Sequence, residues 1–143
     1  MTQTRRTPCV GICSTTYGDL VCRGCKRFAH EIVQWNGYEA SQQQQIWARL
    51  QGLRDEVVEH TLTIIDKTCY DEHTQAKHLQ DLAAVEQRYE LVRHLAIQNM
   101  PLSAGGLQTS TATDDALTTL QAIDGEIYRR SLAHYERNYK IPV

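Results

Sequence analysis

Four cysteines lie close together near the start of the chain, at a spacing that is typical of a metal–thiolate site. Their order is Cys9-x3-Cys13, a gap of eight residues, and then Cys22-x2-Cys25. A short pair of this kind can bend tightly enough to bring two sulfur atoms to one side of the backbone, and two such pairs can surround one metal centre. The spacing therefore predicts a centre with four ligands: Cys9, Cys13, Cys22 and Cys25.

The residues around the cysteines predict the local backbone. Gly11 and Gly24 lie inside the two short pairs, where we expect a positive φ that glycine adopts without strain. A short helix is predicted over residues 26–35, which would place Cys25 at its start. The positive end of a helix dipole lowers the pKa of a thiol and stabilises the thiolate that a metal requires.

Other interpretations of the cysteines are weaker. The four could be unrelated buried residues, or Cys22 and Cys25 could form a redox-active dithiol without a metal, but no thioredoxin-like βαβ pattern surrounds them. The spacing does not select the metal. A gap of eight residues suits a single zinc ion, whereas an iron–sulfur cluster is larger and needs sulfurs held further apart by irregular loops. Zinc and an iron–sulfur cluster both stay open.

Basic residues are concentrated in the same segment. Residues 1–30 contain five basic residues and one acidic residue, although the whole chain has a net charge of -2. This positive end would offset the negative charge of a four-thiolate centre. It is also a candidate contact surface for phosphates, which would give weak, salt-sensitive binding of nucleic acid. Its members are Arg5, Arg6, Arg23, Lys26 and Arg27.

The N-terminal segment resembles a small bacterial family of domains of unknown function, whose members are commonly labelled predicted iron–sulfur proteins. The resemblance covers roughly residues 7–55 and implies a metal-binding module with cysteine ligands, without implying a substrate or a reaction. The chain departs from the family at Phe28, where a small polar residue is more frequent. The residues that carry the resemblance are Pro8-Cys9-Val10-Gly11-Ile12-Cys13, Cys22-Arg23-Gly24-Cys25-Lys26-Arg27, Glu31-Ile32 and Trp35.

Apolar residues recur at helical spacing through the rest of the chain. We predict one helix from a capping box of Ser41 and Gln44 to about residue 68, and a second from Asp71 to about residue 96. A third begins at Thr113 as its N-cap. Residues 102–113 are small and polar and predict a flexible linker, and no strand is expected. The predicted fold is mainly α: a four-cysteine knuckle with a short helix over residues 1–37, and a three-helix antiparallel bundle-like body over residues 38–143.

Three further residues are predicted to have structural roles. Trp35 and Trp47 are expected to pack the short helix against the helical body, and Cys69 is expected to be a small core residue.

Gly105-Gly106 lacks the Lys-Ser/Thr that a phosphate-binding loop requires, so nucleotide binding is not predicted.

The functional hypothesis follows from the metal site. The start of the chain has no apolar signal segment and no stretch is long enough to span a membrane, which predicts a cytoplasmic protein with reduced thiols. Four cysteine ligands leave no open position for catalysis, so we favour a non-enzymatic accessory protein that binds another protein. The alternatives are an iron–sulfur protein for electron transfer or sensing, and a weak nucleic-acid binder.

Overall fold

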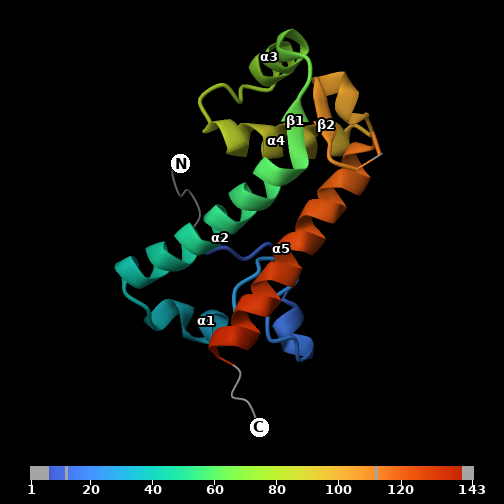
Figure 1. Ribbon diagram of the computed structural model, residues 1–143. Helices are drawn as coiled ribbons and strands as arrows, with labels where there is room; N and C mark the ends of the chain where they lie inside the picture. The colour runs from blue at the N-terminus through green and yellow to red at the C-terminus, as the bar shows by residue number, and fades with distance from the viewer. Residues whose placement is uncertain (1–6, 12, 112, 140–143) are drawn as a thin grey trace. The chain divides into compact units, whose positions relative to one another are not determined.

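The protein is mainly helical in the part of the chain that the computed structural model describes, residues 7–11, 13–111 and 113–139 (Figure 1). No helix in these residues combines the length and apolar character that crossing a membrane requires. The helices are α1 (Ala29–Gln34), α2 (Ala40–Thr61), α3 (Lys67–Ala76), α4 (Ala84–Ile97) and α5 (Ala116–Asn138). The strands are β1 (Leu62–Ile64) and β2 (Leu107–Thr109), and short 3-10 helices cover Ser14–Tyr17, Trp35–Gly37 and Leu102–Gly105.

The chain divides into two compact units. We call Arg54–Gly125 the sheet unit, and we call the described residues of Thr2–Leu53 together with those of Glu126–Val143 the cysteine unit. The mainly helical fold class is confirmed. The predicted boundary near residue 37 and the predicted three-helix body stay predictions.

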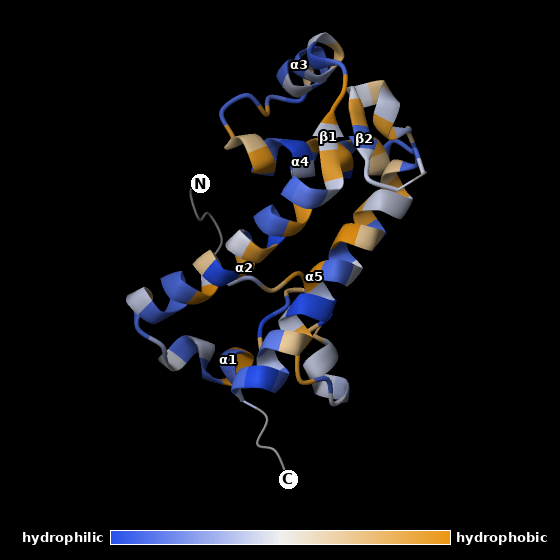
Figure 2. Ribbon diagram, viewed as in Figure 1, coloured by the Kyte–Doolittle hydropathy of each residue, from blue (hydrophilic) through white to orange (hydrophobic). Residues whose placement is uncertain are grey.

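The sheet unit is built around a short antiparallel pair of strands. β1 pairs with β2 so that Leu62 lies opposite Thr109 and Ile64 lies opposite Leu107. Leu62 and Leu107 are buried, and Figure 2 shows hydrophobic residues in both strands beside the mostly hydrophilic α3. Other buried apolar side chains of this unit come from α2, α3, α4, the segments on either side of α4, and α5: Val57, Val58, Tyr70, Leu79, Leu91, Val92, Leu95, Leu102, Ala116 and Ile123.

The prediction that the chain has no strand was wrong. The segment 102–113, predicted as a linker, contains a 3-10 helix and β2, and its Leu102 and Leu107 are fully buried. Gly106 makes this possible, because it has a φ of 72° and its backbone packs tightly against Asp66. The carbonyl oxygen of Gly106 accepts the N–H of Ile65 at 2.8 Å, which fixes the turn before β2.

Two predicted helix boundaries were also wrong. The helix predicted to run to about residue 68 ends at Thr61, because the following Leu-Thr-Ile segment pairs as β1. The helix predicted from Asp71 to about residue 96 is two helices, α3 and α4. Asp66 starts α3, since its side chain accepts the N–H of Cys69 at 3.2 Å, and His78 interrupts the helical path with a φ of 58°.

The predicted N-caps lie a residue or two from the observed ones. α2 starts at Ala40, one residue before the predicted Ser41, and there Gln42 Oε1 accepts the N–H of Glu39 at 2.8 Å. α5 starts after Asp115, whose carboxylate accepts the N–H of Thr118 at 2.9 Å, rather than after Thr113. Short polar side chains near a helix start compete for this role, so the sequence alone does not select one.

The remaining structural predictions have mixed outcomes. Trp35 and Trp47 are buried in one hydrophobic cluster with Ile46 in the cysteine unit, which confirms their packing role. Cys69 is only half-buried, and its thiol donates to the carbonyl oxygen of Ala104 at 3.1 Å. Cys69 is therefore a partly exposed residue that links α3 to the Leu102–Gly105 turn by a hydrogen bond, and it is not a core residue.

We expect Tyr70 to make the stability of the sheet unit sensitive to alkaline pH. Its hydroxyl donates to Gln87 Oε1 at 2.8 Å, and burial raises its pKa from 10.0 to about 12. Because the fold favours the neutral phenol, its contribution is complete below pH 10 and is lost as the pH rises toward 12. Denaturant unfolding across this pH window should therefore show a shallower loss of stability in Tyr70→Phe than in the wild type. If the free energy of unfolding fell equally steeply with pH in both proteins, Tyr70 would not be the group responsible.

Candidate metal centre

A tight turn carries Cys22 and Cys25. Val21 and Phe28 form an antiparallel bridge, and inside it the N–H of Cys22 donates to Arg27 O and the N–H of Lys26 donates to Cys22 O, both at 2.9 Å. We call these residues the Cys22–Arg27 turn. The predicted positive φ at Gly24 was wrong, because Lys26 instead takes the left-handed conformation, with a φ of 69°.

Backbone N–H groups surround the sulfur of Cys22. The side chain is buried, and the N–H groups of Cys25, Ser14 and Gly24 all donate to it. Burial alone would raise its pKa, but these hydrogen bonds outweigh burial and lower the pKa from 9.0 to about 7. Cys22 is therefore held in an environment that favours a thiolate.

Lys26 binds the carbonyl oxygens of the peptide groups whose N–H groups donate to Cys22. Its buried ammonium donates to the carbonyl oxygens of Arg23, at 2.6 Å, and Gly24, at 2.8 Å. Those two peptide groups carry the N–H groups of Gly24 and Cys25 that donate to Cys22. A cation on each carbonyl polarises the peptide and strengthens the hydrogen bond from its N–H. Lys26 therefore helps to position the donors around Cys22.

Cys25 lies beside Cys22 but in a different electrostatic environment. Burial raises its pKa, although Arg27 opposes the rise by donating from Nε to Cys25 Sγ at 3.3 Å. The predicted position of Cys25 at a helix start was wrong, because α1 begins only at Ala29. Stabilisation of a Cys25 thiolate therefore comes from the Arg27 guanidinium and not from a helix dipole.

Cys13 and Cys9 precede the turn. Cys13 is half-buried, and a hydrogen bond with Thr15 Oγ1 at 2.8 Å lowers its pKa. Cys9 is exposed, and its sulfur accepts the N–H of Gly11 at 3.3 Å. The positive φ predicted for Gly11 is confirmed, at 96°.

The structure brings some of the predicted ligands together. Cys22 and Cys25 share a hydrogen bond between their side chains, and the N–H of Ser14, the residue after Cys13, reaches the Cys22 sulfur. Over the described ranges, no three Cys, His, Asp or Glu side chains are grouped closely enough to hold a metal ion. The donor chemistry nevertheless suits one: soft thiolates select zinc or iron–sulfur centres, and the N–H groups at Cys22 are the partners that such a thiolate needs.

A buried ion pair between Glu31 and Arg49 supports the end of the Cys22–Arg27 turn at Phe28. Glu31 Oε1 accepts the N–H of Phe28 at 2.8 Å, and the two Glu31 oxygens accept two N–H groups of Arg49, each at 2.6 Å. The Arg49 guanidinium also lies 4.2 Å from the centre of the Phe28 ring. Sequence analysis missed Arg49, because it lies eighteen residues from Glu31 and no local pattern links them.

Phe28 is the centre of an aromatic cluster, which gives a physical reason for a large residue at this position. Its side chain is fully buried. The rings around it have centroids 5.3 to 5.8 Å away and belong to His30, His134, Tyr135 and Tyr139.

The predicted basic contact surface is largely internal in the described residues. Lys26 and Arg27 are buried, and the Arg27 guanidinium lies 4.9 Å from the ring centre of Trp35. Arg23 is exposed and pairs with Asp19 at 3.2 Å. Arg5 and Arg6 lie outside the described residues. Buried cations beside thiols favour the charge-offsetting role over phosphate contact.

One comparison with known proteins gives a match, and it covers the N-terminal segment. No curated protein and no solved structure gives a significant match to the chain. A family model described as "Protein of unknown function (DUF1289)" matches residues 7–54, which include the four cysteines and both residues of the buried ion pair. The match agrees with the resemblance seen in the sequence, and residues 7–54 are therefore similar to this uncharacterised domain family.

Proposed function

We propose that the protein is a small metal-binding accessory protein, in which Cys9, Cys13, Cys22 and Cys25 hold one zinc ion or one iron–sulfur cluster. The centre would tie the segment around Cys9 and Cys13 to the Cys22–Arg27 turn. Four thiolates would fill a tetrahedral site, so the metal would have a structural role, and its binding free energy would add to the stability of the cysteine unit.

One observation carries this proposal: the environment of Cys22. Three backbone N–H groups donate to its sulfur and lower its pKa to about 7, so a Cys22 thiolate forms more readily than that of an ordinary cysteine. A buried anion in a protein interior is costly unless a cation compensates it. Lys26 donates to two carbonyl oxygens of the turn, and Arg27 donates to Cys25. A metal bound to Cys22 and the neighbouring cysteines would add its positive charge to these compensating interactions.

The surface beside the cysteines supports a protein partner. Large apolar side chains are exposed on the cysteine-bearing segment and on α1: Tyr17 is 89% exposed, Val33 83% and Val10 54%. Exposed apolar side chains that form a contiguous patch are typical of interaction surfaces, so this part of the proposal requires the three side chains to lie together. We infer that the metal would hold this segment in shape for binding another protein.

Serine variants test the ligand set. We expect Cys9→Ser, Cys13→Ser, Cys22→Ser and Cys25→Ser each to lower the metal content of the purified protein well below one centre per chain. Cys69→Ser is the matched control and should retain it, because Cys69 lies in the sheet unit. Elemental analysis with gel filtration, to exclude unfolded material, gives the measurement. Equal metal content in all five variants would exclude the proposed ligands.

A second candidate has its own supporting observation. Cys22, with a lowered pKa, lies against Cys25, whose pKa is raised. This combination suits a dithiol that oxidised glutathione converts to a disulfide: both thiols lose a proton and the pair loses two electrons, which reduce glutathione disulfide to two thiols. Metal-free native protein that forms this bond, detected by a mass decrease of about two hydrogens and by peptide mapping, would favour this candidate over the metal centre.

A further inference from the structure

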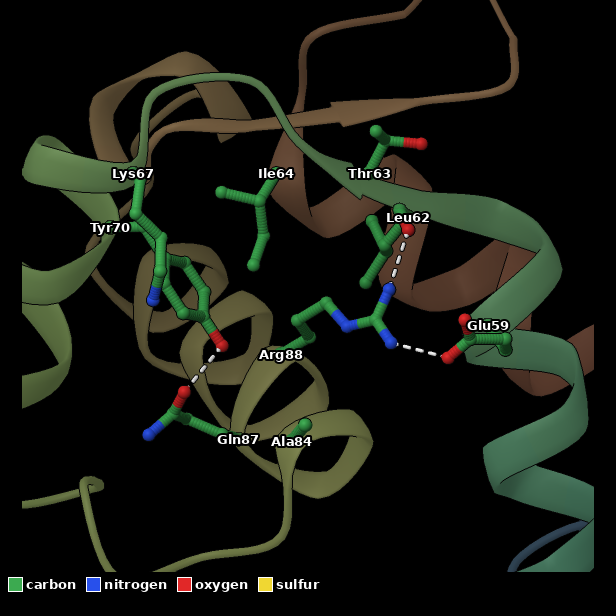
Figure 3. A pocket seen from close by; sticks show the side chains of 9 residues that line it. All are labelled: Glu59, Leu62, Thr63, Ile64, Lys67, Tyr70, Ala84, Gln87 and Arg88. Atoms are coloured by element: carbon green, nitrogen blue, oxygen red, sulfur yellow. Dashed lines mark hydrogen bonds and ion pairs between the residues drawn. The ribbon is translucent and has the colours of Figure 1, made fainter.

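A pocket of about 420 Å³ lies in the sheet unit, and none of the four proposed metal ligands lines it. Figure 3 shows that β1 and the start of α3 form one side of it, and that Arg88 and Gln87 of α4 form the other. Tyr70 lines its wall with a buried ring. None of the roles assigned above uses this pocket.

The pocket lies along the outer edge of β1. Thr63 lies opposite Gln108 in the β1–β2 pair, and hydrogen bonds from Ile65 to Gly106 and from Ser110 to Thr61 flank it. In an antiparallel pair, alternate residues direct their backbone groups toward the partner. The N–H and C=O of Ile64 therefore point away from β2, and no described residue is bonded to them.

Arg88 shows which side of the strand faces the pocket. Its guanidinium donates to the carbonyl oxygen of Leu62 at 2.9 Å and also pairs with Glu59 (Figure 3). The outer edge is thus covered at Leu62 and open at Ile64. Proteins usually cover or block such an edge, because unpaired backbone groups are a template for another strand.

The charges at the open end favour an acidic occupant. Two cations, Lys67 and Arg88, and one carboxylate, Glu59, line the pocket. Because Glu59 pairs with Arg88, Lys67 is the cation that a ligand at the open end would meet. The Lys67 ammonium lies 5.5 Å from the ring centre of Tyr70, beside Ile64 in Figure 3. Its ion pair with Asp71 is between side chains that are 71% and 45% exposed, so a ligand carboxylate can replace it at little cost.

We propose that this pocket binds an extended acidic peptide segment of a partner protein. A residue of that segment would pair with the N–H and C=O of Ile64 and so add a third strand to the sheet. An acidic side chain two positions along would reach Lys67, and an apolar one would pack on Tyr70. Main-chain pairing supplies affinity in this mode of recognition, and side chains supply selectivity. The added strand would also stabilise a sheet that has only two strands.

The test uses the full ¹⁵N-labelled chain and the synthetic peptide acetyl-Val-Glu-Val-Glu-Val-amide as the probe. We expect the amide resonance of Ile64 to shift during titration and its hydrogen exchange to slow. A version of the peptide with N-methyl groups on alternate residues should bind about tenfold more weakly, because it loses the donors that pair with Ile64. A version with lysine in place of glutamate should also bind more weakly.

Two variants complete the test. Lys67→Gln should weaken binding of the acidic peptide roughly twofold to fivefold, as expected for an exposed charge pair. Ile64→Pro should remove binding while keeping the β1–β2 pairing, because the N–H of Thr63, not that of Ile64, faces β2. The proposal is overturned if millimolar peptide leaves the Ile64 amide unchanged, or if the N-methylated or lysine peptide binds as well as the probe.

Discussion

Replacing Glu31 with alanine should lower the free energy of unfolding by about 3 kcal/mol, the low end of the range seen when one member of a buried ion pair is removed, because the Arg49 side chain is 28% exposed. Glu31 is almost fully buried, and its carboxylate accepts two N–H groups of Arg49 and the backbone N–H of Phe28. The variant would leave the Arg49 guanidinium without its carboxylate partner. It would also leave a backbone donor unpaired at the end of the Cys22–Arg27 turn.

Asp71→Ala is the matched control for this prediction. It removes the carboxylate of another Lys/Arg pair, but that pair is exposed, and its loss should cost less than about 1 kcal/mol. Urea unfolding followed by circular dichroism measures both variants. If Glu31→Ala were as stable as Asp71→Ala, the buried pair would not be the support that we describe.

Gly106→Ala should destabilise the sheet unit by about 3 kcal/mol or more. The φ of 72° at Gly106 is one that side chains rarely adopt, and this alone costs roughly 1–2 kcal/mol. An added Cβ would also lie 2.4 Å from the carbonyl oxygen of Asp66, which is backbone and cannot move aside easily. The turn that leads into β2 would have to shift, and its bond to Ile65 would weaken.

Gly52→Ala is the control for the glycine substitution. Gly52 lies inside α2, and nothing lies within 4 Å of the position that its Cβ would take. Alanine there should stabilise the protein by about 1 kcal/mol through its higher helix propensity. The melting temperature in thermal unfolding should therefore fall for Gly106→Ala and rise for Gly52→Ala. A neutral Gly106→Ala would mean that the turn after Leu102–Gly105 is not as close-packed as described.

Local sequence signals predicted much of the cysteine unit. The Asn36-Gly37 stop placed the end of the short helix correctly, to within the following 3-10 turn, and the two tryptophans form the expected cluster. The positive φ at Gly11 also followed from residue type. These features depend on residues that are close in sequence, which is why a pattern can indicate them.

Features that depend on distant residues could not be predicted in the same way. The β1–β2 pair joins segments more than forty residues apart, and each strand has only three residues, too few for an alternating pattern. A lysine in the left-handed conformation contradicts residue preference, and it is stabilised here by bonds from Lys26 to two carbonyls. The burial of Lys26 and Arg27 likewise follows from what they bond to and pack against, and not from their hydropathy.

The central claim is that the four N-terminal cysteines share a metal centre. The most direct test is the metal and sulfide content of protein purified without oxygen from its native host, together with its visible absorption spectrum. We predict close to one centre per chain, either as zinc in colourless protein or as iron with matching sulfide in coloured protein. Protein that is folded and fully reduced, and that contains neither zinc nor iron, would contradict this account.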